Sequence, residues 1–326
     1  MEEKAVQKKG VLTRQRKRLI FYTCLIAIPS LQFLLFYFYV NFNSILLSFQ
    51  KYEIKLDGVG YNVSFAFFEN FSKAWGIFIS SGQMILNSLT LYLCNLVIVS
   101  TFALLFSYYI AKKHYFSGFF RVMLFLPNII SQVALVTIFK TVVNNVFVEV
   151  MKSLGAEAWL KSNHLEFGLL SNSAPDNVIF GTVLVYNLWV GFGTNVMMYT
   201  GAMSAIDQSI IESAQLDGVS FLGEFIHIYV PLIWPTFTTF VVTGLTGLFT
   251  STMHLVVFYG TVLDPPFEVF GYFLYKQTLN SSLTSTHPNY YPYSILSSLG
   301  VIVTMILVPV TLTVRKLMEK YGPRTD

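Results

Sequence analysis

Residues 19–40 form a run of 22 residues without a charged side chain, and five further stretches of similar length are almost as apolar. A helix needs about 20 predominantly apolar residues to cross the roughly 30 Å hydrocarbon core of a bilayer. Backbone groups in lipid must be satisfied within their own segment, so such stretches are predicted to be helices. Charged residues make up 12% of the chain, half of the roughly 25% typical of soluble domains. The sequence therefore predicts an all-α polytopic membrane protein.

Six transmembrane spans are predicted, at residues 19–40, 84–111, 122–143, 178–203, 233–258 and 294–314. The first follows a basic segment, 1–18, and exceeds the apolar length of about 7–15 residues found in signal peptides. It is therefore expected to stay in the protein, and residues 19–326 are expected to form one transmembrane domain. Between the third and fourth spans, residues 147–160 are expected to be helical, either at the outer membrane interface or as a plain connector.

The distribution of Lys and Arg predicts the orientation, because cytoplasmic loops carry an excess of these residues. With the N-terminus inside, the inner segments 1–18, 112–121, 204–232 and 315–326 hold 14 of the 21 basic residues. Both termini are therefore expected in the cytoplasm. The inner loop 204–232 departs from the pattern, since it has no Lys or Arg but four acidic residues. Topology alone does not explain such a composition.

Motifs for soluble catalysis are absent from the sequence. There is no phosphate-binding G-x-x-x-x-G-K-[ST], no zinc-binding H-E-x-x-H and no G-x-S-x-G nucleophile motif. The two cysteines and five histidines are scattered, so neither a metal site nor a bound cofactor is expected. The formal charge of +4 is too small and too dispersed to indicate nucleic-acid binding. We expect a non-enzymatic protein.

The acidic inner loop carries the most specific pattern. Glu212 is followed at two, six, sixteen and nineteen residues by Ala214, Gly218, Ile228 and Pro231. We expect a short helix at 206–216, a turn in which Gly218 supplies a positive φ, and a second helix leading to Pro231. The result would be an L-shaped protrusion on the cytoplasmic face.

This spacing resembles the E-A-A motif of permease subunits in binding-protein-dependent bacterial ABC importers, with Ser213, Val219 and Val230 as conservative departures. Asp217 before the glycine resembles the sugar-importing branch. The Leu126-Pro127-Asn128 run and Trp189 resemble sugar permeases of the maltose-type superfamily, and the basic N-terminus resembles the first of the two permeases that such systems use. The resemblance implies a type I importer permease fold in the bacterial inner membrane.

The resemblance also implies a division of labour among subunits. The expected partners are a second permease, a dimeric ATPase that holds ATP and Mg²⁺, an extracytoplasmic sugar-binding protein, and the membrane lipid. The expected contacts to the ATPase are Glu212, Ser213, Ala214, Asp217, Gly218, Ile228 and Pro231. The chain itself would form half of a pathway for a sugar or oligosaccharide.

Uncharged polar residues within the spans are the candidates for that pathway, because they are costly in lipid and usually face a cavity or another helix. The candidates are Asn128, Gln132, Trp189, Phe192, Asn195, Tyr199, Thr243, Thr246, Thr250 and His254. The fifth span shows a stripe at spacings of three and four that also includes Thr236 and Thr239, and one helical face is expected to carry it. Small hydroxyl residues at this spacing also let helices pack closely, so pathway and packing both remain open.

Two other functions use polytopic proteins. An ion-coupled secondary transporter usually carries buried acidic or basic groups, whereas five of the six predicted spans have none and the third has Lys140 alone. A membrane-embedded transferase needs clustered carboxylates or histidines, which are absent from this sequence. Co-purification with an ATPase subunit distinguishes the importer from both.

Overall fold

A computed structural model describes residues 2–55, 60–260, 265–284 and 290–323. Among these, five helical stretches are long and apolar enough to cross a bilayer: Arg16–Ser48, Gly82–Ala111, Gln132–Ser153, Asp176–Ser204 and Tyr293–Tyr321. A sixth candidate is the pair Phe221–Leu232 and Trp234–Gly247, which is bent by 65° at the break between them. The prediction of a helical membrane protein with about six spans is confirmed.

The chain divides into two compact units, and the first comprises Met1–Gly76 and Ser281–Ile302. Its elements are α1 (Glu2–Gln32), η1 (Phe33–Tyr39, a π-helical segment), α2 (Val40–Ser48), β1 (Gln50–Ile54), β2 (Tyr61–Phe65) and the beginnings of α3 and α17. The two strands form an antiparallel hairpin in which Gln50 lies opposite Phe65. The all-α prediction misses this hairpin, whose short alternating pattern lies between two much stronger apolar signals.

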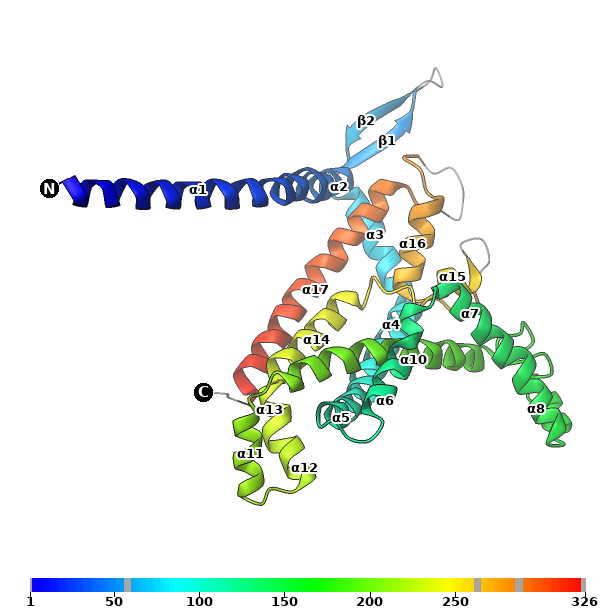
Figure 1. Cartoon of the computed structure of the whole chain (residues 1–326). Helices are drawn as coiled ribbons and strands as arrows, with labels where there is room; N and C mark the ends of the chain where they lie inside the picture. Colours follow the sequence, from blue (N-terminus) through cyan, green and yellow to red (C-terminus); the bar gives the residue numbers. More distant parts are fainter. Residues whose placement is uncertain (1, 56–59, 261–264, 285–289, 324–326) are drawn as a thin grey trace. The chain divides into compact units, whose positions relative to one another are not determined.

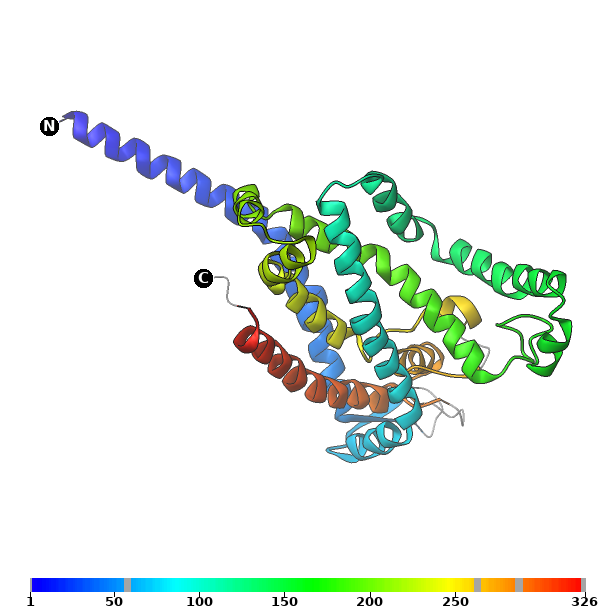
Figure 2. The same ribbon diagram turned by 90° about the horizontal axis from the view of Figure 1, so that it is seen from below.

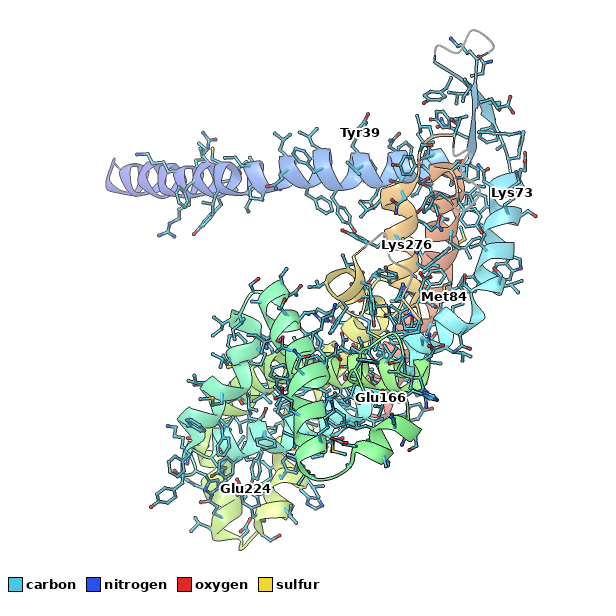
Figure 3. The ribbon with its side chains drawn as sticks, turned by 90° about the vertical axis from the view of Figure 1, so that its right-hand side faces the viewer. Tyr39, Lys73, Met84, Glu166, Glu224 and Lys276 are labelled. Atoms are coloured by element: carbon cyan, nitrogen blue, oxygen red, sulfur yellow. The ribbon has the colours of Figure 1, made fainter. Side chains whose placement is uncertain are left out.

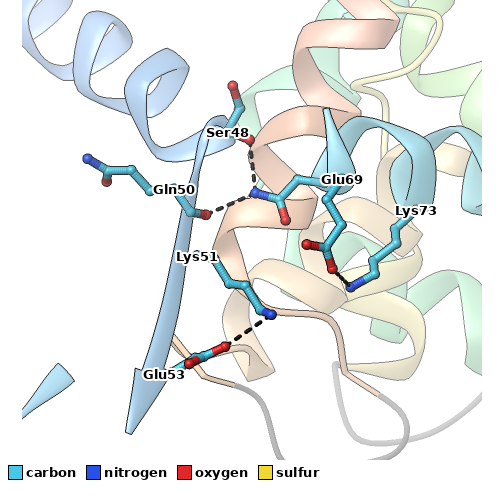
Figure 4. Close-up of polar contacts among 7 residues, drawn as sticks. Ser48, Gln50, Lys51, Glu53, Glu69 and Lys73 are labelled. Carbon is cyan, nitrogen blue, oxygen red and sulfur yellow. Dashed lines mark hydrogen bonds and ion pairs between the residues drawn. The ribbon is translucent and has the colours of Figure 1, made fainter. Parts of the chain in front are cut away.

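A buried amide joins the elements of this unit. The Asn70 side chain is 3% exposed, and its Nδ2 donates to the carbonyl oxygens of Ser48 at 3.0 Å and Gln50 at 2.9 Å (Figure 4). The Ser298 hydroxyl donates to the same Ser48 carbonyl at 3.0 Å. Carbonyls left unpaired where α2 ends are thus satisfied by side chains from α3 and α17.

The second unit comprises Ile77–Asn280 and Val303–Asp326. Its elements are the end of α3 (Glu69–Ser80), α4 (Gly82–Cys94), η2 (Asn95–Val99), α5 (Ser100–Ala111), α6 (Ser117–Ile129), α7 (Gln132–Thr141), η3 (Val142–Val146), α8 (Phe147–Ser153), α9 (Glu157–Ser162), α10 (Asp176–Ser204), α11 (Gln208–Leu216), α12 (Phe221–Glu224), η4 (Phe225–Tyr229), α13 (Val230–Leu232), α14 (Trp234–Gly247), α15 (Leu255–Tyr259), α16 (Phe270–Asn280) and the end of α17 (Tyr293–Tyr321). Beyond the end of α10, α11 and α12 form a helical hairpin (Figure 1).

The centre of this unit is a continuous helix made of α4, η2 and α5, which packs beside α10 (Figure 2). The Ser107 hydroxyl on α5 donates to the Val196 carbonyl on α10 at 2.9 Å. One turn away on α10, a Cβ added to Gly193 would lie 2.0 Å from the Leu124 carbonyl oxygen of α6. The glycine therefore lets these two helix backbones approach more closely than any other residue allows.

The predicted third span, 122–143, is not one helix. α6 ends at Ile129, residues Ile130 and Ser131 have extended ψ angles of 142° and 130°, and α7 then begins. Pro127 lies within α6 and lacks the backbone donor of other residues, which weakens the helix just before its end. The stretch long enough to cross a bilayer begins at Gln132 and continues through η3 and α8.

The predicted fifth span, 233–258, is also interrupted. α14 ends at Gly247, and the chain turns until α15 begins at Leu255. Tight bonds close these turns, including Thr250 N–H to the Gly247 carbonyl at 3.1 Å, and His254 has a φ of +57°. Glycine and β-branched residues are weak helix formers, so the local sequence does not itself fix the end of α14. Contacts with the surrounding helices decide where this helix ends.

The segment 147–160 is helical as predicted, but it forms two helices instead of one. α8 ends at Ser153 and α9 begins at Glu157, with Gly155 between them at a φ of +76°. Leu160 is 1% exposed and belongs to a small apolar cluster with Val148 and Ile179. The segment therefore packs on the start of α10.

Candidate functional site: a helical hairpin and a polar pocket

The loop predicted to contact an ATPase is a helical hairpin whose first helix is capped by Asp207. The Asp207 carboxylate accepts a hydrogen bond from the Ser209 backbone N–H at 3.0 Å. This bond favours the charged carboxylate, so it holds the pKa of Asp207 below its ordinary value. α11 runs from Gln208 to Leu216, close to the predicted 206–216. The acidic residue thus marks the start of the helix.

The turn at the tip of the hairpin depends on Gly218. Its φ is +75°, its N–H donates to the Gln215 carbonyl at 3.1 Å, and the Val219 N–H donates to the Ala214 carbonyl at 3.2 Å. These two bonds form a Schellman motif, in which the glycine takes the left-handed conformation just after the helix. Nothing lies within 4 Å of a Cβ built on Gly218, so backbone conformation and not space restricts this position. The predicted positive φ is confirmed.

The second arm of the hairpin is held by α5. The Ser220 hydroxyl caps α12 by accepting from the Gly223 N–H at 3.2 Å. The Tyr108 hydroxyl on α5 donates to the Phe221 carbonyl at 3.0 Å. Glu224 is 4% exposed, and its Oε1 lies 2.6 Å from Lys112 Nζ at the end of α5. Glu224, labelled in Figure 3, lies toward the opposite end of this unit from Met84 near the start of α4.

The predicted contact residues fall into an exposed and a structural group. Glu212 and Ser213 are exposed, and the Ser213 hydroxyl donates to the Ser209 carbonyl at 2.8 Å. Ala214 is 9% exposed and Ile228 is half-buried, Asp217 ends α11, and Pro231 lies in the first turn of α13. Apolar side chains extend the exposed surface: Ile210, Leu216, Leu222 and Ile226. The hairpin therefore presents exposed apolar side chains together with three exposed carboxylates, those of Asp207, Glu212 and Asp217.

A pocket of about 330 Å³ lies between α4, η2, α10 and α14. Its lining includes two predicted residues, Asn195 and Thr243. The polar residues that the sequence analysis missed are Ser88, Tyr92, Asn95, Ser100 and Ser251. The sequence offered one signal for this pocket, because Asn95 lies in the middle of the charge-free second span. The residues that line this pocket include no Asp, Glu, Lys or Arg.

Two asparagines form the polar wall of this pocket. Asn95 Nδ2 donates to the Leu91 carbonyl at 2.9 Å, and Asn195 Nδ2 donates to the Gly191 carbonyl at 3.1 Å. Within the described part of the chain, neither side-chain oxygen accepts a hydrogen bond. Asn95 begins η2, a π-helical segment of a kind that often occurs at functional sites. The wall can therefore accept hydrogen bonds from a hydroxylic ligand.

Other predicted pathway residues hold helices together. Asn128 Nδ2 donates to the Val190 carbonyl at 3.2 Å, and its Oδ1 accepts from the Thr194 hydroxyl at 3.0 Å. Tyr199 is 0% exposed and packs against Phe240 with ring centroids 4.9 Å apart. These three contacts link α10 to α6 and to α14, so the structure does not bring Asn128 or Tyr199 to the polar pocket.

The remaining predicted residues are also dispersed. Trp189 and Phe192 line a separate apolar pocket of about 220 Å³, and Gln132 is exposed at the start of α7. The Thr246 hydroxyl bonds to the Thr243 carbonyl, and the Thr250 hydroxyl bonds to the Gly247 carbonyl. Because α14 ends at Gly247, the expected stripe on a single helical face is wrong for Thr250 and His254.

His254 belongs to a buried polar junction. Its Nδ1 lies 2.7 Å from Asn187 Oδ1, while Asn187 Nδ2 donates to the Val183 and Met253 carbonyls at 2.8 and 3.1 Å. Because the asparagine nitrogen is used as a donor, its oxygen must accept, and His254 carries the proton on Nδ1. The junction ties the turn after α14 to α10.

Sequence comparisons find relatives among transport proteins. The probable ABC transporter permease protein YurN of Bacillus subtilis is 26% identical over 51% of this chain and 55% of its own length. The lactose transport system permease protein LacF of Rhizobium radiobacter is 28% identical over 51% and 53%. The maltose/maltodextrin permease MalF of Vibrio vulnificus is 26% identical over 35% of this chain and 20% of its own length. The chain thus spans about half the length of YurN and LacF, and no protein-family model matches it.

Structural comparison gives the same fold over nearly the whole chain. A chain of a bacterial ABC transporter involved in the import of the acidic polysaccharide alginate matches with a TM-score of 0.66 and 19% identity, covering 95% of this chain and 99% of its own. The complex of the alginate ABC transporter with an alginate pentasaccharide-bound periplasmic protein gives a TM-score of 0.66, with 18% identity and coverage of 94% and 96%. The sequence relatives are thus permeases of ABC transporters, and the alginate transporter chain shares the fold of this chain over nearly its whole length.

Proposed function

We propose that the chain is a transmembrane permease subunit of an ATP-binding-cassette importer, and that it forms half of the pathway for a sugar or oligosaccharide. The observation that carries this proposal is the hairpin between α10 and α14. A Schellman turn at Gly218 and caps at Asp207 and Ser220 hold it in one conformation. Its exposed surface combines apolar side chains with the carboxylates of Asp207, Glu212 and Asp217, which suits insertion into a cleft of a soluble ATPase.

The partners follow from this arrangement. The ATPase dimer binds ATP and Mg²⁺ and contacts the hairpin, while a second permease completes the pathway. An extracytoplasmic binding protein delivers the sugar, as the alginate complex with its periplasmic protein illustrates for that transporter. The chain itself is non-catalytic and resides in a bacterial inner membrane. Support comes from the ABC permease relatives and from Arg16–Ser48, a helical stretch long and apolar enough to cross a bilayer.

The polar pocket is the proposed sugar contact, and its chemistry favours neutral sugars. Sugar hydroxyls donate and accept hydrogen bonds, and Asn95 and Asn195 offer amide oxygens for this purpose. The lining of the pocket includes no Lys or Arg to pair with uronic-acid carboxylates. Uptake of neutral oligosaccharides and of uronic-acid oligosaccharides of equal length, each presented by the cognate binding protein, tests this selectivity. Transport of the uronic acids alone would overturn it.

The proposed orientation places both termini in the cytoplasm. Ser213 and Asn172 are both exposed and lie at opposite ends of α10. Cysteines introduced at these positions, with Cys24 and Cys94 replaced, should react with an impermeant thiol reagent from opposite sides of the membrane. Labelling of both from outside intact cells would contradict the topology.

The decisive experiment for the function is reconstitution with partner subunits in proteoliposomes. An importer hydrolyses ATP faster when loaded binding protein is added, and it takes up sugar in an ATP-dependent manner. An ion-coupled transporter would instead respond to an ion gradient and ignore ATP. Failure to co-purify with any ATPase would refute the importer.

A further inference from the structure

We propose that the buried ion pair between Lys112 and Glu224 is a positioning latch that makes the hairpin move with the helix that forms the pocket wall. The inference rests on the proposed function, since it assigns a route of coupling within the importer. It also gives a role to Glu224, the last of the four acidic residues in the loop 204–232, which has no Lys or Arg. Asp207 and Asp217 occupy the ends of α11, Glu212 is exposed, and Glu224 lies buried against α5.

The geometry of the pair is that of a buried contact. The Lys112 and Glu224 side chains are 16% and 5% exposed, and their charged atoms lie 2.6 Å apart. No hydrogen bond to Glu224 Oε1 accompanies the ion pair within the described part of the chain. A buried carboxylate that relies on one cation is strongly affected by its loss, because the remaining charge has no compensation.

Lys112 lies at the C-terminus of α5, where a positive charge is favoured and where the helix contacts the hairpin. It caps the C-terminus of α5, where its N–H bonds to the carbonyls of the last turn and the helix dipole attracts positive charge. One turn earlier, Tyr108 is 2% exposed and contacts the same arm of the hairpin. Its hydroxyl donates to the Phe221 carbonyl, and its ring centroid lies 5.1 Å from that of Phe225 and 4.8 Å from that of Tyr229.

One continuous helix connects the latch to the pocket. α4, η2 and α5 run without a break from Gly82 to Ala111, and the pocket residues Tyr92, Asn95 and Ser100 lie on them. Lys112 follows Asn95 by 17 residues, about 25 Å along a helix at 1.5 Å per residue. A shift of the hairpin therefore moves the end of the same helix whose middle forms the polar wall.

The latch differs from the covalent links of the hairpin. Through the chain, the hairpin is joined to α10 and to α14, and α14 reaches it across the 65° bend. Together with the contacts of Tyr108, the ion pair forms a third attachment, to a helix far away in sequence. Motion of the hairpin is thereby shared with the pocket wall and is not absorbed at the bend.

The test is Glu224→Gln in the complete complex, with Lys113→Met as the matched control, since Lys113 is the exposed neighbouring lysine. The ratio of sugar uptake to ATP hydrolysed should fall about two- to thirtyfold, the range in which single residues modulate coupling, with complex abundance unchanged. The charge swap Lys112→Glu with Glu224→Lys should recover part of that ratio. Lys113→Met should leave it unchanged.

A second readout does not depend on transport. Backbone hydrogen exchange of the segment 221–229 in the purified complex should rise in Glu224→Gln and fall back in the charge swap. An unchanged uptake ratio together with unchanged exchange overturns the latch, and so does a loss of uptake proportional to complex abundance. If the wild-type complex lacks stimulated ATP hydrolysis, the proposed function fails, and hydrogen exchange alone then decides whether the latch exists.

Discussion

The hairpin of α11 and α12 and the polar pocket use their polar side chains in opposite ways. In the hairpin, Asp207, Ser220 and Glu224 are each engaged by a neighbouring backbone group or ion. In the pocket, Asn95 and Asn195 donate to their own helix, while their oxygens accept no hydrogen bond within the described residues. A region with every group engaged holds one conformation, whereas a region with available acceptors can exchange partners.

This difference separates two kinds of mutational effect. Changes in the hairpin should disturb geometry, and so affect ATP-linked steps without altering which sugar is recognised. Changes in the pocket should alter sugar transport while leaving the folded protein intact. The following predictions test that separation, from the largest expected effect to the smallest.

Gly218→Val should have the largest effect. A left-handed conformation costs an L-residue about 1–2 kcal/mol, and a β-branched side chain makes it worse, so the second arm of the hairpin should be misdirected. We expect stimulated ATP hydrolysis and uptake to fall about tenfold or more in proteoliposomes. Gly218→Asn is the matched control, because asparagine tolerates positive φ. Equal damage by both substitutions would show that φ is not the cause.

His254→Ala should come next, and it should act on stability. Removing the imidazole leaves the buried Asn187 oxygen without its partner, which typically costs about 1–3 kcal/mol. Thermal unfolding of the purified chain in detergent should shift downward, while the sugar concentration for half-maximal uptake stays the same. Thr250→Val, at an exposed position in the same turn, should leave both unchanged. A selective change in sugar dependence would instead move His254 into the pathway.

Asn195→Ala should give an intermediate effect on transport. A lost uncharged hydrogen bond is worth about 0.5–1.5 kcal/mol, so uptake efficiency should fall about two- to twelvefold. Complex abundance and thermal stability should remain at the wild-type level. Asn128→Ala provides the contrast, because that amide joins two helices and its loss should lower stability. If Asn195→Ala lowered stability and Asn128→Ala lowered only transport, the roles of the two asparagines would be exchanged.

Asp207→Ala should have the smallest effect, a modest loss of thermal stability that Asp207→Asn avoids, because asparagine is also a good helix cap. Folding lowers the pKa of Asp207, so the stabilisation from its charge is present above the unfolded pKa and is lost as the pH falls through the folded pKa. Between about pH 5 and pH 9 the difference between Asp207→Ala and wild type should therefore stay constant. If the difference in thermal stability shrank within this pH range, the charged Asp207 carboxylate would not be the helix cap.

Sequence reasoning succeeded best where the backbone conformation requires a particular type of residue. The positive φ of Gly218 and the short helix before it follow from local chemistry, so the sequence predicted them, whereas the expected L shape is a hairpin in the structure. The stripe of threonines failed because a period of three and four presupposes an unbroken helix. The end of α14 at Gly247 and the break at Ser131 are set by tertiary contacts, which leave no periodic trace.

The pocket shows a second limit of sequence reasoning. Asn195 and Thr243 were found because polar residues in the fourth and fifth spans are numerous enough to attract notice. Asn95 was missed although an amide within the second span was visible, because a single polar residue is often only a helix contact. Its position on the pocket wall depends on how α4 and α14 cross, where the Tyr92 hydroxyl donates to the Val241 carbonyl at 3.3 Å.

Because η2 is π-helical, the number of residues in the second span matters as much for its contacts as their identity. Its wider turn, Asn95–Val99, carries the pocket residue Asn95 and lies between the pocket residue Tyr92 and the residues that hold the hairpin. Deleting one residue there would leave a span of ample length, but everything after it would rotate by about 100° relative to everything before it. Ser107 and Tyr108 would then turn away from α10 and from the hairpin. The span should therefore accept exchange of one amino acid for another more readily than a change in its length.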